Sequence, residues 1–273
     1  MSLNALTVIS FAATCLGAGT SVLAQQAPLD RPVLAPVTVK AVGNPVEKFY
    51  RKMIAGMDLF ERMHALAPNA PLRFKLLPRK PNTNMLDIKL EVIGTTFSRA
   101  VPIAPDSTFT VARDAKAVAE DAVVSPNRRQ LSMTWRTDIR TPGLPAGARR
   151  LGDLRLECMV GIEAGLVSNS NPLTEKISAL FTSPSGYCGR KDAKYLFFAD
   201  RPIFAVTLIT GARREVLAID QLYAEASDDT GLKADLPFCD CEVLLDRTYF
   251  LPLGDASWPD DTLVQFEFME DAP

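Results

Sequence analysis

Apolar side chains recur at steps of three and four residues in one stretch near the beginning of the chain, residues 44–67. The apolar positions are Val46, Phe49, Met53, Met57, Phe60 and Met63. The charged side chains of the stretch lie on the opposite face, and this spacing predicts an amphipathic helix over 44–67. Asn44, Pro45 and Glu47 fit a capping box at its start, and Pro68 ends it.

From residue 72 onward, apolar and polar residues alternate in short runs, which is the pattern of half-buried β-strands. The runs are Leu72–Leu76, Leu86–Val92, Thr108–Val111, Leu131–Trp135, Leu154–Leu156, Tyr195–Phe198, Ile203–Ile209, Val216–Ile219, Val243–Leu251 and Leu263–Phe268. Clusters of turn-forming residues, such as 81–84 and 228–231, separate them. A short helix is expected over Asp114–Val124. The sequence therefore predicts a mainly β fold preceded by one amphipathic helix.

The rhythm of these strands suggests how they are arranged. Short strands separated by turns every eight to twelve residues or so are typical of antiparallel sandwiches. In this rhythm, and without a diagnostic motif, the chain resembles immunoglobulin-like and prealbumin-like modules of exported proteins, which implies an antiparallel sandwich-like fold. A polar stretch at 165–172 separates a first β-rich region, 68–165, from a second, 173–273. We expect either a pair of domains or one continuous domain.

The first 24 residues have the features of a cleavable secretory signal peptide. An apolar run, Ala5–Leu16, is followed by small residues and by a Val-Leu-Ala sequence that ends at Ala24 and suits signal peptidase. Residues 25–43 form a proline-rich leader. We therefore expect a periplasmic or secreted protein that is cleaved near Ala24 and has no transmembrane segment in the mature chain.

Four cysteines follow the predicted cleavage point: Cys158, Cys188, Cys239 and Cys241. An even number of cysteines in an exported chain predicts two disulfides. A ring closed by Cys239 and Cys241 would be strained, so we expect each of these two to bond with Cys158 or Cys188.

Charges are unevenly distributed along the chain. Residues 25–150 contain 20 lysines and arginines and 11 aspartates and glutamates, whereas residues 151–273 contain 10 and 21. The candidate contact residues are seven arginines of one segment: Arg128, Arg129, Arg136, Arg140, Arg149, Arg150 and Arg155. Arginine suits bidentate contact with carboxylate or phosphate. The anion is either external, an acidic envelope polymer or an envelope protein, or the acidic half of the same chain, and the opposed charges favour internal pairing.

Few residue types in the sequence suit catalysis or metal binding. His64 is the only histidine, which excludes metal sites that need two. There is no phosphate-binding glycine loop and no dinucleotide motif, and the arginine segment has only Trp135 as an interleaved aromatic residue. We therefore expect no catalytic residue, metal, cofactor or nucleic acid, and we predict an exported binding or structural β-module. The alternative is a carboxylate-only hydrolase of envelope glycan or peptide, which needs two suitably spaced acidic residues.

Overall fold

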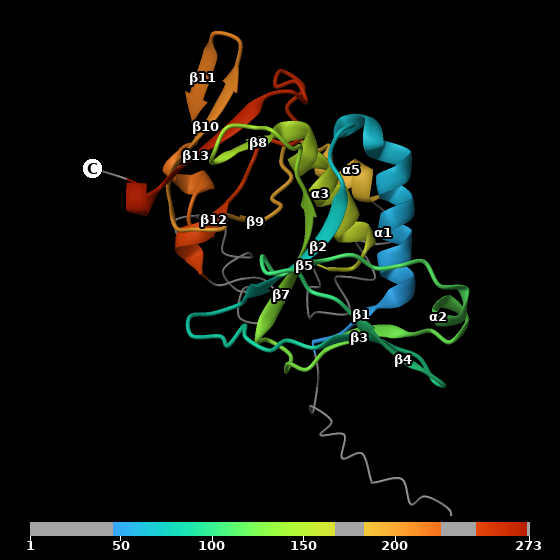
Figure 1. Ribbon diagram of the computed structural model, residues 1–273. Helices are drawn as coiled ribbons and strands as arrows, with labels where there is room; N and C mark the ends of the chain where they lie inside the picture. Colours follow the sequence, from blue (N-terminus) through green and yellow to red (C-terminus); the bar gives the residue numbers. More distant parts are fainter. Residues whose placement is uncertain (1–45, 167–182, 225–243, 272–273) are drawn as a thin grey trace, which may run out of the picture. The chain divides into compact units, whose positions relative to one another are not determined.

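The computed structural model describes residues 46–166, 183–224 and 244–271, which belong to one compact unit (Figure 1). The predicted signal peptide and leader, together with Cys239 and Cys241, lie outside these ranges. Within them, no helix is long and apolar enough to cross a membrane.

The helices and strands of the described residues are short. The helices are α1 (Tyr50–Met63), α2 (Ala115–Ala119), α3 (Leu151–Glu163) and α5 (Pro184–Cys188), with 3-10 helices at His64–Leu66, Ile219–Gln221, Leu245–Arg247 and Met269–Asp271. The strands are β1 (Lys48–Phe49), β2 (Leu72–Pro78), β3 (Leu90–Ile93), β4 (Ser98–Val101), β5 (Thr108–Phe109), β6 (Val123–Pro126), β7 (Met133–Ile139), β8 (Ala148–Arg150), β9 (Phe197–Phe198), β10 (Ile203–Thr210), β11 (Arg213–Val216), β12 (Thr248–Tyr249) and β13 (Leu263–Phe268).

These strands pair antiparallel in four sheets. The strand orders are β1-β6-β3-β4, β11-β10-β13-β8, β5-β2-β7 and β12-β9. The prediction of a β-rich, mostly antiparallel fold is therefore confirmed, and the sandwich arrangement stays a prediction. Strand β8, from the first predicted β-rich region, pairs with β13 from the second. Strands of both regions thus share one sheet.

The predicted helix at 44–67 begins later than its capping signal indicates. Val46 and Glu47 are not helical, and α1 begins at Tyr50, so the predicted capping box is wrong. Tertiary contacts explain the difference: the Val46 carbonyl accepts a hydrogen bond from Trp135 Nε1 at 3.1 Å, and β1 pairs with β6. These contacts hold the segment extended. As a result Phe49, assigned to the apolar face, points to solvent and is 63% exposed.

Helix α1 packs against α3 (Figure 1). The point of close approach is Gly56, where an added Cβ would lie 2.7 Å from the Ala164 side chain. Only glycine allows the helices to come this near, because any larger side chain meets the facing residue. The buried face of α1 comprises Tyr50, Met53, Gly56 and Leu59.

The segment Leu154–Leu156, predicted as a strand, lies inside helix α3. Every residue from Leu151 to Gly161 except Arg155 is buried, because α1, β7 and α5 all pack against this helix. A helix buried on all sides has no polar face and therefore lacks the 3.6-residue period of an amphipathic helix. The alternation of only three residues, Leu154–Leu156, does not distinguish a strand from such a helix, and the strand prediction is wrong.

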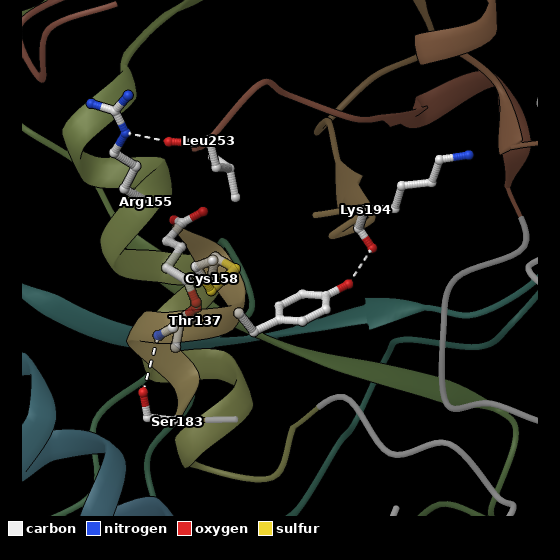
Figure 2. Close-up of a disulfide and its surroundings, with 10 residues drawn as sticks. Thr137, Arg155, Cys158, Ser183, Lys194 and Leu253 are labelled. Atoms are coloured by element: carbon white, nitrogen blue, oxygen red, sulfur yellow. Dashed lines mark hydrogen bonds between the residues drawn. A yellow bond between two sulfur atoms is a disulfide. The ribbon is translucent and has the colours of Figure 1, made fainter. Parts of the chain in front are cut away.

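A disulfide joins α3 to α5. It is formed by Cys158 and Cys188, whose Cα atoms are 6.1 Å apart (Figure 2). The expected pairing of these two cysteines with Cys239 and Cys241 is therefore wrong. The packing of α5 against α3 accounts for the observed pairing, since it brings the two buried side chains together.

Candidate functional site

Charged side chains gather on one face of the β2–β7 pair. Lys75 on β2 lies directly opposite Arg136 on β7 in the antiparallel register. Like charges in directly opposed positions are unfavourable, and the two side chains have different partners. Lys75 Nζ lies 2.6 Å from Asp200, and the Arg136 guanidinium lies 4.2 Å from the ring centroid of Phe198.

Two carboxylates join three cations into a continuous ionic cluster. Arg73 Nη2 lies 2.6 Å from one oxygen of Asp138, and Arg140 Nε lies 2.6 Å from the other. Arg140 Nη1 reaches Asp200 at 2.9 Å, and the second Asp200 oxygen accepts a hydrogen bond from Lys75. Both oxygens of each carboxylate are therefore engaged.

The pKa values of Asp200 and Arg140 are shifted by their neighbours in this cluster. Burial raises the pKa of Asp200, but the positive charges of Arg140 and Lys75 outweigh burial and lower it to about 2. Burial lowers the pKa of Arg140, and the neighbouring Asp138 and Asp200 more than compensate and raise it above its ordinary value. At neutral pH Asp200 and Arg140 are therefore both charged.

A second, fully buried ion pair lies next to the cluster and ties β8 to α3. Arg149 Nη2 lies 2.6 Å from Glu157 Oε1 and also donates to the Ile139 carbonyl at 2.8 Å. The same Glu157 oxygen accepts a hydrogen bond from the Ile139 N–H at 2.7 Å. Burial raises the pKa of the Glu157 carboxyl, and the Arg149 charge opposes this shift.

A pocket of about 190 Å³ lies beside these charges. It is bounded by the turn after β7, by β8 and β13, by the segment that follows β9, and by β12. Its lining residues are Arg140, Gly147, Ala148, Arg149, Phe198, Ala199, Asp200, Arg201, Tyr249, Phe266 and Phe268. The pocket thus combines arginines with aromatic rings.

Hydrogen-bond donors at the pocket are left without acceptors. The Nε of Arg149 is buried and has no hydrogen-bond partner. No hydrogen bond to the Tyr249 hydroxyl is found among the described residues. Burial raises the pKa of Tyr249, so this hydroxyl stays protonated and can donate. The Arg149 Nε is enclosed by protein on all sides, whereas the Tyr249 hydroxyl is not enclosed in this way, so the hydroxyl is the donor that an acceptor in the pocket could meet.

Aromatic rings form the remaining wall of the pocket. Tyr249 lies against Phe266, with centroids 5.1 Å apart and the rings nearly perpendicular. Phe266 in turn stacks with Phe268 at 6.1 Å. The Arg201 guanidinium lies 4.0 Å from the Phe268 centroid, which places a cation over the outermost ring.

A smaller cavity of about 30 Å³ adjoins the cluster and is lined among others by Asp138, Glu157 and Tyr195. This volume holds about one or two water molecules. The Tyr195 hydroxyl is buried there without a hydrogen-bond partner, and burial raises its pKa to about 12. It lies over Gly161, where an added Cβ would be 2.5 Å from the hydroxyl oxygen.

The structure brings three of the seven predicted contact arginines together. Arg136, Arg140 and Arg149 belong to the charged region described above, and the last two line the larger pocket. Arg140 and Arg149 pair with Asp200 and Glu157, both from the acidic C-terminal part of the chain. Arg140 also pairs with Asp138, which belongs to the basic N-terminal part, and the role of these arginines as contact residues stays a prediction.

The other four arginines lie elsewhere: Arg128, Arg129, Arg150 and Arg155. The two at α3 are paired with acidic residues, Arg150 with Asp153 at 3.7 Å and Arg155 with Asp260 at 2.5 Å. Arg128 donates to backbone carbonyls of residues 84, 86 and 127, and the remaining one is exposed. These four do not line the pocket.

Several residues of the site were not identified from the sequence: Lys75, Glu157, Phe198, Asp200 and Tyr249. Each lies in or next to a predicted strand, but nothing in its local sequence marks it as a partner of a distant arginine. One signal is present in the sequence: the charged residues Arg136 and Asp138 are two positions apart along β7, so they lie on one face of the strand. All seven residues of β7 are buried. Buried charges require partners, so this face of the strand forms part of a polar interior.

Comparisons of the chain with protein-family models, with curated proteins and with solved structures find no match. In the described ranges, no group of three or more histidine, cysteine, aspartate or glutamate side chains is placed to hold a metal ion.

Proposed function

We propose that the protein is an exported, non-catalytic module that binds an anion in the pocket beside the ionic cluster. The observation that carries this proposal is the separation of charges around the pocket. Arg140, Arg149 and Arg201 line it together with a single carboxylate. Their other acidic partners lie outside this lining: Asp138 and Glu157 face the smaller cavity, and Glu270, 3.4 Å from Arg201, is exposed. The pocket therefore presents a positive surface to a ligand.

The hydrolase alternative has a specific candidate residue, Glu157, because a raised pKa is typical of a general acid. Its surroundings argue against that role. Glu157 accepts hydrogen bonds from Arg149 and the Ile139 N–H, and the cavity that it lines, at about 30 Å³, has no room for a scissile bond with its flanking groups. Asp200, with a pKa lowered to about 2, is a weak base at neutral pH.

Export is supported by the disulfide between Cys158 and Cys188. Structural disulfides form in oxidising compartments and are rare in the cytosol. Together with the signal-like first 24 residues, this bond supports a periplasmic or secreted location. Sequencing the N-terminus of the protein recovered from the envelope or medium tests this part, with residue 25 expected as the first residue and an intact N-terminus as the contrary result.

Binding and the absence of turnover can be tested on the same purified protein. A ligand that binds the native state raises the melting temperature. We expect at least one of acetate, benzoate, phosphate and citrate to raise it relative to chloride at constant ionic strength. We also expect no new reducing ends or free amines from envelope glycan or peptides. Turnover that is lost in Glu157→Gln would support the hydrolase, and no stabilisation by any anion would contradict the binding module.

A further inference from the structure

We propose that the pocket between β8, β12 and β13 takes a small aromatic carboxylate, a single ring that carries one carboxylate group. This inference rests on the proposed function and specifies its ligand. Three properties of the pocket lead to it: its size, its donors and its aromatic wall.

The volume of the pocket matches a ligand of one ring. A protein cavity of about 150 Å³ lined by apolar side chains holds a benzene molecule. The pocket at about 190 Å³ holds such a ring and a further group of about three atoms. A polymer chain or a two-ring ligand would not be enclosed.

The donors of the pocket suit one carboxylate. The protonated Tyr249 hydroxyl lines the pocket and has no hydrogen bond among the described residues. The guanidinium groups of Arg140 and Arg149 lie in the same lining. A carboxylate can accept a hydrogen bond from the hydroxyl, and the neighbouring positive charges favour its ionised form. Charge-assisted hydrogen bonds of this kind are stronger than neutral ones, so an ionised ligand is favoured over its amide.

The aromatic wall suits a flat, apolar ligand body. Phe198, Phe266 and Phe268 have no hydrogen-bonding group in their side chains, so a hydroxylated body such as a sugar acid would lose hydrogen bonds to water without replacement. An aromatic ring instead gains edge-to-face or stacked contacts with these rings. At the rim, Arg201 extends the cationic surface over Phe268.

The experiment is calorimetric titration of the full mature protein with benzoate at fixed ionic strength. Benzamide, which has the same ring without the charge, acetate, which has the charge without the ring, and phosphate are the comparison ligands. We expect one saturable site for benzoate and at least tenfold weaker binding of each comparison ligand. Benzamide binding as tightly as benzoate would overturn the role of the arginines.

A matched pair of variants locates the binding. Arg201 stacks on Phe268 at the pocket, and Arg213 stacks on Trp258 at 3.5 Å outside its lining. Their side chains are equally exposed, at 42% and 43%. Arg201→Gln should weaken benzoate binding at least fivefold, and Arg213→Gln should leave it unchanged. Equal effects in the two variants would overturn the assignment of the ligand to this pocket.

The possible failures are distinguishable. Acetate or phosphate could bind as tightly as benzoate, or bind when benzoate does not. If Arg201→Gln weakens that binding, the anion-binding function stands and the proposed aromatic carboxylate is wrong. If no anion in the series binds, both the ligand assignment and the proposed function are wrong. A circular dichroism spectrum unchanged by Arg201→Gln provides the control that the variant is folded.

Discussion

Removal of the Cys158–Cys188 disulfide should lower the free energy of unfolding by about 3.6 kcal/mol, if the bond acts by restricting the unfolded chain. The bond closes a loop between residues 30 apart in the sequence. In the chain-entropy description a loop of this length reduces the freedom of the unfolded state by that amount at 25 °C. For a protein of this size, each kcal/mol lowers the melting temperature by about 2–4 °C, which gives a total decrease of about 7–14 °C.

The double variant Cys158→Ala/Cys188→Ala is the direct test, because both thiols are removed together. Urea unfolding can be followed by tryptophan fluorescence, since Trp135 and Trp258 are both buried in the folded state. Reductant should shift the wild-type unfolding midpoint towards that of the variant. The surroundings of the bond should persist in the folded variant, including the hydrogen bond from Arg155 to the Leu253 carbonyl (Figure 2).

A loss of less than about 1 kcal/mol would refute the loop-closure reasoning, because it would be no more than the effect of a typical point mutation. A loss of the expected size in a variant that still binds benzoate would instead assign the bond to stability alone. Neither cysteine lines the pocket, and the disulfide would then have no role in ligand binding.

Three further predictions concern the charged cluster and the helix contact. The pKa of Asp200 is lowered from 3.8 to about 2, so its contribution to the free energy of unfolding is present above about pH 4 and is lost as the pH falls through 2. Because the carboxylate is partly exposed, we expect this contribution to be about 1–2 kcal/mol. Acid unfolding of Asp200→Asn should lack it. Arg149→Met should cost about 3–5 kcal/mol at pH 7 in urea unfolding, and less near pH 4 because Glu157 can then be protonated. Arg190→Met, which removes an exposed ion pair with Asp192, should leave the urea midpoint nearly unchanged; equal losses would contradict the assigned contacts. Gly56→Val should cost about 1–3 kcal/mol by forcing α1 from α3, and an unchanged urea midpoint would show that the helices do not meet there.

The strands that could be predicted from the sequence are those with one buried and one exposed face. Residues Leu263–Phe268 form β13 with the predicted bounds, and the run Ile203–Ile209 corresponds to β10, which is one residue longer. Alternation is visible in such strands because solvent selects polar residues at every second position. The short helix expected over Asp114–Val124 is observed as α2, which covers only Ala115–Ala119, and the Asp114 side chain caps it by accepting hydrogen bonds from the N–H groups of residues 116 and 117.

The elements that could not be predicted are those whose surroundings are all protein. Helix α3 is buried on nearly every side, so its sequence has no polar face to define a helical period. At the predicted start of the first helix, the hydrogen bond from Trp135 to the Val46 carbonyl competes with the local capping sequence. Contacts between residues 89 positions apart overrode that local preference.

The candidate site could be predicted only in part, because its pairs are distant in sequence. The arginine-rich segment predicted Arg140 and Arg149 as contact residues, and the opposed charges of the two halves of the chain favoured acidic partners within the protein. The identity of those partners follows from β-strand register and from the packing of α3, which local patterns do not contain. Lys75 and Asp200 form an ion pair across 125 positions, and no periodicity or motif relates them.

The most direct test of an anion site in this pocket is a crystal structure of the protein with benzoate. The account predicts density for one ring beside Phe198, Phe266 and Phe268, with the carboxylate within hydrogen-bond distance of the Tyr249 hydroxyl. Benzoate bound elsewhere, with this pocket filled only by water, would contradict the account.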